Sequence, residues 1–111
     1  MKQLAEPVTG PEGLTSVRSR SGALAITCTA AGLPVRMRIS AAAMRRSPDA
    51  LAQEILALCR LAGAAAGVSN RAQLVGDGVD EETLGLLGLP SRAELVAAEA
   101  AADACAARGR R

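Results

Sequence analysis

The sequence of 111 residues contains no phenylalanine, tyrosine, tryptophan or histidine. Without aromatic rings the chain has no surface on which unpaired bases stack, so we do not expect a single-strand reader of the RRM or OB type. Without histidine it lacks the commonest general base and the usual activator of a nucleophilic thiol. No GxSxG element, Walker loop or convincing carboxylate pair replaces them. We therefore predict that the protein is not an enzyme and holds neither a metal nor a cofactor.

Cysteines are few and long apolar runs are absent. Cys28, Cys59 and Cys105 are odd in number and show no CxxC spacing, which favours reduced thiols in a cytoplasmic protein. The first residues lack the apolar core of a secretory signal, and no apolar run approaches the length that spans a bilayer. We therefore expect a cytoplasmic location and no membrane partner.

Acidic residues are missing from one continuous stretch, residues 13–48. The net charge is only +2, so its distribution matters more than its total. Most acidic residues lie in the second half of the chain, whereas the acid-free stretch carries six arginines: Arg18, Arg20, Arg36, Arg38, Arg45 and Arg46. This charge asymmetry suits the binding of a polyanion, or attraction between the oppositely charged halves of neighbouring subunits.

The acid-free stretch also has the pattern of a small sheet. Segments near residues 17–20, 23–30 and 33–40 alternate in polarity and are separated by tight glycine turns, which predicts a three-stranded antiparallel meander. In the third segment, alternation places Val35, Met37 and Ile39 on one face, toward the core. The same alternation places Arg36 and Arg38 on the other face, which is a candidate anion-binding surface.

Helix signals follow the sheet. Ser47, Pro48 and Asp49 suit the N-cap, the first helical position and the first turn of a helix. An apolar stripe then covers the sheet, and Gly67 is the expected stop. The stripe consists of Leu51, Ile55, Leu58, Ala62 and Ala65.

Two further helices are predicted in the C-terminal part. Asp80 is expected to cap a short helix over residues 81–87 that ends at Gly88. Ser91 and Glu94 form a capping box for a final helix over residues 92–107. The expected fold class is α+β, a meander covered by a helix with additional C-terminal helices. It divides into an irregular arm (residues 1–13), a sheet-plus-helix core (14–67) and a loop with a helical extension (68–111).

Residues 15–66 resemble the YbaB/EbfC family of nucleoid-associated proteins. The resemblance is carried by residues 21–32, where a glycine precedes and follows an alternating strand, by the strand over 35–39, and by the helix opening over 47–55. Small alanine- and arginine-rich relatives of this kind are familiar from high-GC actinobacteria, some beside type VII secretion components. The resemblance implies a homodimer in the nucleoid that binds duplex DNA without strong sequence preference and without a cofactor. This chain departs from the family in lacking the usual N-terminal helix and in its C-terminal extension.

Two functions are thus open from the sequence. In the first, the six arginines of the acid-free stretch bind DNA phosphates, for which the planar guanidinium fork is suited. The simpler explanation of such a face is the solvated side of an antiparallel sheet. In the second, the same fold is a protein–protein adaptor, associated with type VII secretion, in which the C-terminal helical region meets the partner.

Overall fold

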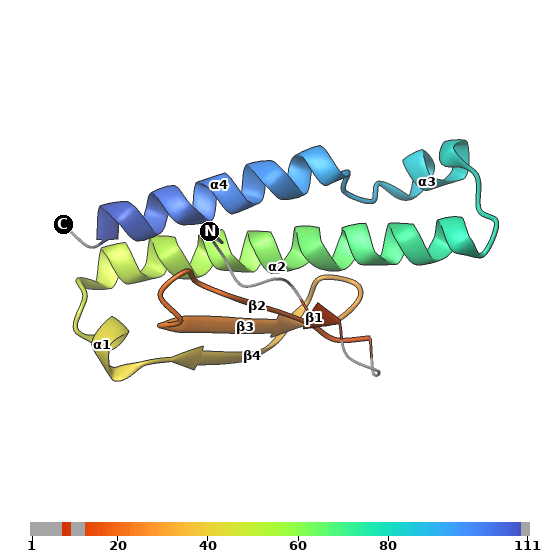
Figure 1. Ribbon diagram of the computed structural model, residues 1–111. Coiled ribbons are helices and arrows are strands. Elements are labelled where there is room, and N and C mark those ends of the chain that lie inside the picture. The colour runs from red at the N-terminus through yellow and green to blue at the C-terminus, as the bar shows by residue number, and fades with distance from the viewer. Residues whose placement is uncertain (1–7, 10–12, 110–111) are drawn as a thin grey trace.

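The computed structural model describes residues 8–9 and 13–109. Four antiparallel strands form one sheet in the order β1 (Val8–Thr9), β2 (Thr15–Arg18), β3 (Leu24–Cys28) and β4 (Pro34–Ile39). A short helix α1 (Ala41–Met44) leads to the long helix α2 (Pro48–Gly76), followed by α3 (Glu81–Leu87) and α4 (Arg92–Gly109). Helix α2 lies across one face of the sheet, and α4 runs back along α2 on the side away from the sheet (Figure 1). The predicted α+β class is confirmed.

Strands β2 to β4 form the predicted meander, with Gly22 and Gly32 in the two turns at positive φ of 79° and 87°. The strand β1 was not predicted, because two residues are too few for alternation to show. It pairs Val8 with Ser16 and Thr9 with Thr15, inside the segment expected to be an irregular arm.

The core lies between α2 and the two middle strands. Leu24 and Ile26 of β3 are fully buried against α2, together with Val17 of β2. Met37 is the cross-strand neighbour of Ile26 and therefore faces the same side of the sheet, as predicted. The expected burial of Met37 and Val35 is wrong, because α2 packs on β2 and β3 and leaves the edge strand β4 largely uncovered.

The predicted helix starts are correct. The hydroxyl of Ser47 accepts a hydrogen bond from the Ala50 N–H at 3.2 Å, and Pro48 is the first residue of α2. Asp80 caps α3, which ends at Gly88 in the left-handed conformation. Both bonds of the capping box form before α4: Ser91 N–H to Glu94 Oε1 at 2.7 Å and Glu94 N–H to Ser91 Oγ at 3.2 Å.

The predicted stop of α2 at Gly67 is wrong, because the helix continues to Gly76. Gly67 serves a close contact instead. A Cβ atom at this position would lie 2.3 Å from Cδ of Pro90, in the segment that leads into α4. The glycine therefore permits the close approach of that segment to the helix.

Helix α4 docks on α2 through Leu95, Ala102 and Ala106, all buried. By length and composition α2 is apolar enough to cross a membrane, but the sheet and α4 cover two of its sides. Helix α2 is therefore the central element of the core.

Gly67→Ala should destabilise the protein, whereas Gly63→Ala should stabilise it. At Gly67 the added methyl must displace the Pro90 ring, and over-packing typically costs about 1–3 kcal/mol. At Gly63 an added Cβ meets no atom within 4 Å, and alanine favours a helix interior by about 1 kcal/mol over glycine. Urea unfolding of both variants measures the two effects, and a stabilised Gly67→Ala variant would contradict the Pro90 contact.

Candidate nucleic-acid interface

The outer face of the sheet, opposite α2, carries arginines in register. Arg18 of β2, Ala25 of β3 and Arg38 of β4 are cross-strand neighbours and so form one row. The next row consists of Ser16, Thr27 and Arg36, and the Ser16 and Thr27 hydroxyls are hydrogen-bonded at 2.8 Å. Three predicted site residues, Arg18, Arg36 and Arg38, are thus brought together on one exposed surface, which we name the arginine face.

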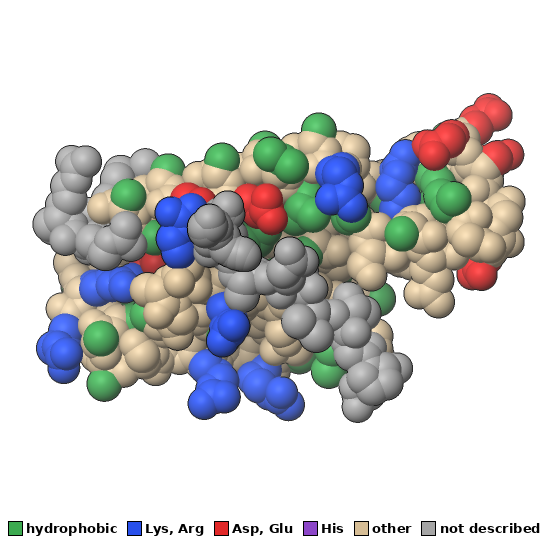
Figure 2. All heavy atoms as spheres, in the orientation of Figure 1, with side chains coloured by type: hydrophobic (Ala, Val, Ile, Leu, Met, Phe, Trp, Pro, Cys, Tyr) green, Lys and Arg blue, Asp and Glu red, His purple; other side chains and the backbone are tan. Residues whose placement is uncertain are grey.

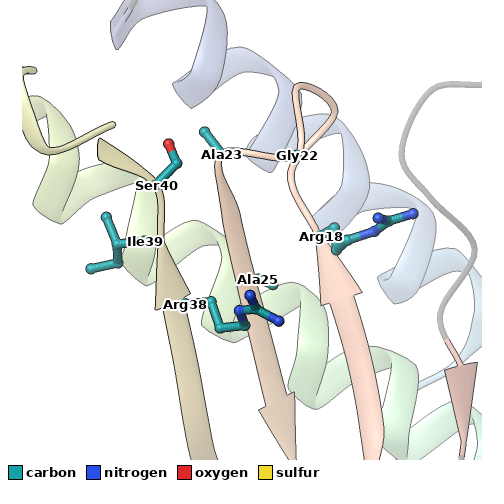
Figure 3. A pocket seen from close by; sticks show the side chains of 7 residues that line it. All are labelled: Arg18, Gly22, Ala23, Ala25, Arg38, Ile39 and Ser40. Atoms are coloured by element: carbon teal, nitrogen blue, oxygen red, sulfur yellow. The ribbon is translucent and has the colours of Figure 1, made fainter. Parts of the chain in front are cut away.

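The arginine face is hollowed where its first row lies. The hollow has a volume of about 330 Å³ and is lined by Arg18, Gly22, Ala23, Ala25, Arg38, Ile39 and Ser40. The Arg38 side chain extends over β3 beside Ala25, while the Arg18 side chain extends from β2 away from β3 (Figure 3). The small side chain of Ala25 keeps the floor of the hollow open beside Arg38.

The charged side chains of the strands that form the arginine face are all basic. Strands β2, β3 and β4 contain no acidic residue. Figure 2 shows basic side chains along the sheet at the bottom of the view and acidic side chains around α3 at the far end. A phosphate at the arginine face therefore meets no carboxylate on these three strands.

The other three predicted site residues lie elsewhere. Arg20 follows the end of β2 and pairs with Asp103 of α4 at 2.6 Å, so it holds the β2–β3 turn to α4. Arg45 is exposed at the C-cap of α1, beyond the sheet. Arg46 forms an ion pair with Glu54 of α2, in which the two side chains are only 15% and 3% exposed. Strand alternation could not reveal either ion pair, because the partners come from helices.

The thiol of Cys28 belongs to the core, as predicted. It donates a hydrogen bond to the Ala62 carbonyl at 3.3 Å. Burial raises the pKa of Cys28, and the nearby Cys59 raises it further, so the thiol stays neutral. A neutral buried thiol is a poor nucleophile, which supports a structural role. Cys59 and Cys105 are partly buried against the same core.

Comparison with protein-family models, curated proteins and solved structures finds no match for this chain. The resemblance to the YbaB/EbfC family therefore stays a hypothesis that depends on the residues named above.

Arg46→Ala should be strongly destabilising, unlike Arg45→Ala. Without Arg46 the buried carboxylate of Glu54 is left unpaired, and its Oε2 has no hydrogen-bond partner among the described residues. Breaking a buried pair from one side costs about 3–5 kcal/mol, whereas an exposed substitution changes stability by about 0.5 kcal/mol or less. Thermal or urea unfolding checks this, and equal effects of the two variants would show that the Glu54 pair is not formed.

Stability should fall as the pH rises from neutral into the alkaline range. Because the pKa of Cys28 is raised on folding, the folded state keeps the thiol protonated at a pH where the unfolded chain loses its proton. The contribution of this thiol to stability is complete below the pKa that it has in the unfolded chain. It is lost as the pH rises through the pKa that it has in the folded state. With no tyrosine and a single lysine in the chain, few other side chains titrate there. Urea unfolding against pH should show a shallower alkaline decline for Cys28→Ala, and an unchanged slope would contradict the assignment.

Proposed function

We propose that this protein is a non-enzymatic, YbaB-like DNA-binding factor that acts as a homodimer in the cytoplasm, at the nucleoid. Its contacts are made to phosphates and are independent of base sequence. The observation that carries the proposal is the arginine face, an acid-free surface on which Arg18 and Arg38 are in register and line one hollow, with Arg36 in the next row.

The geometry of the arginine face suits a backbone rather than a base edge. Neighbouring strands are about 4.8 Å apart, so Arg18 and Arg38, two strands apart, have backbones about 10 Å from each other. Arg36 and Arg38 are two residues apart on one strand, a separation of about 7 Å. Guanidinium groups at these spacings contact several phosphates at once, and each makes a bidentate charge-assisted bond.

The architecture also supports binding without base readout. The chain has no aromatic residue to stack on bases, and the long helix α2 is covered on two sides by the sheet and α4. Phosphate contacts position a protein on DNA and carry no sequence information of their own.

A second function, a protein–protein adaptor associated with type VII secretion, is favoured by a different surface. Helix α3 exposes Leu86 and Leu87 beside the acidic residues Glu81 and Glu82. Exposed leucines with acidic neighbours suit a protein partner that has an apolar and basic surface. An adaptor of this kind holds its partner in the absence of DNA.

Duplex DNA should bind at low salt, with little difference between sequences. Each neutralised phosphate contributes a slope of about −0.9 to log affinity against log salt. Replacing Arg36 and Arg38 with Gln should reduce the slope by the equivalent of up to about four phosphate contacts in a dimer. The affinity for all duplexes should fall alike. Fluorescence anisotropy of labelled duplexes across a salt series measures both changes.

The matched control is Arg60→Gln with Arg92→Gln, which removes the same charge from exposed positions on α2 and α4. This control should keep most of the salt slope. Absence of binding by the wild-type protein at about 50 mM salt, where phosphate contacts are strongest, would overturn the DNA proposal. Equal losses in the two double variants would show that net charge, and not the arginine face, is responsible.

A further inference from the structure

The hollow of the arginine face has a floor of small apolar residues beside a cationic side chain. Ala25 of β3 and Ala23, just before it, line the floor, and the Arg38 side chain extends over β3 beside Ala25 (Figure 3). Arg38 makes no ion pair with any residue that the structure describes. A cavity of about 150 Å³ can hold a benzene ring, so a hollow of about 330 Å³ has room for a leucine side chain. The hollow therefore suits an apolar side chain that has a carboxylate next to it.

Helix α3 carries this combination on its outer side. Leu84 is fully buried, whereas Leu86, two positions further and so about 200° around the helix axis, is 84% exposed. Glu82 lies four positions before Leu86, so these two exposed side chains are neighbours on one helix face, which we name the α3 knob. Among the described residues Glu82 has no ion-pair partner, whereas Glu81 pairs with Arg71 at 2.8 Å.

The α3 knob cannot reach the hollow of its own molecule. Ser40, which lines the hollow, lies just before α1 and the start of α2, whereas α3 follows the end of α2 (Figure 1). Helix α2 has 29 residues and is therefore about 43 Å long. Only a second molecule can bring an α3 knob to the hollow.

We infer that the α3 knob of one copy of this chain docks in the hollow of a second copy, with Leu86 on the Ala25 floor and Glu82 paired with Arg38. The charges of the two surfaces are complementary, because strands β2 to β4 contain no acidic residue and α3 contains no basic one. The two surfaces differ from each other, so the contact is heterologous and needs neither a strand edge nor a two-fold axis. Repeated from molecule to molecule, it produces an open chain of copies.

The docking has a consequence for DNA. It occupies Arg38, which the proposed function assigns to a phosphate contact. Duplex DNA and the α3 knob should therefore exclude each other, so that added DNA disperses the chains of copies. This consequence rests on the proposed function, whereas the docking itself does not.

Reversal of the two charges tests the docking. Glu82→Arg and Arg38→Glu each place like charges at the contact, and both positions are exposed, so the fold should tolerate them. In sedimentation velocity at low salt without DNA, the wild-type species should keep growing with concentration beyond a dimer. Each single variant should weaken this association about tenfold. An equimolar mixture of the two variants should restore it, because each reversed charge then meets an opposite charge on the other variant.

Asp77→Arg is the matched control, because it reverses an acidic charge at the exposed C-cap of α2, outside the α3 knob. The control should leave the association unchanged, whereas Leu86→Ser should weaken it by removing the apolar side chain. The inference is overturned if the wild type does not grow with concentration, if the mixture associates no more than its components, or if the control loses as much as Glu82→Arg. Because these samples contain no DNA, a failed restoration refutes only the docking, and a separate absence of DNA binding refutes only the proposed function.

Discussion

The packing of one helix on the sheet is the constraint on which the rest of the structure depends. A helix with its side chains is about 10–12 Å wide, and strands are about 4.8 Å apart, so one helix covers roughly two strands. Helix α2 covers β2 and β3, and α4 occupies a second side of α2. Helix α4 therefore covers no part of the sheet, and both the edge strand β4 and the outer face of the sheet stay exposed. The arginine face is one of the surfaces that this arrangement leaves uncovered.

The local signals in the sequence predicted local structure well. The caps at Ser47, Asp80 and Ser91 were correct because each depends on bonds within three residues of the cap. The end of α2 was not predicted, because the reason for Gly67 is Pro90, a residue far along the chain that packs on the helix. A glycine required for a close contact and a glycine that ends a helix look alike in a sequence.

The candidate site was predictable to the extent that strand alternation holds. It correctly placed Arg36 and Arg38 on one face, since period two is a property of the extended backbone, and the register of the sheet adds Arg18 to them. It did not separate from them Arg20, just beyond the strand, or Arg46, in a connection between helices. Their carboxylate partners are 83 and 8 residues away, and only the packed structure brings these charges together. The exposure of Met37 could not be predicted either. Alternation shows on which face of the sheet a side chain lies, but not whether the helix above is wide enough to cover that strand.

The alanine surface of α4 has a kinetic consequence. Its buried side chains toward α2 are mainly alanines, each of which removes little apolar area from water. The contacts that hold this helix join α4 to the distant α2, and closing the long connection between such elements slows their formation. Such an element opens at a lower free energy than the whole protein unfolds, so amide hydrogens of α4 exchange before those of β3. When α4 leaves, the side of α2 that it covers becomes accessible, and the central helix changes from a core element to a partly exposed surface.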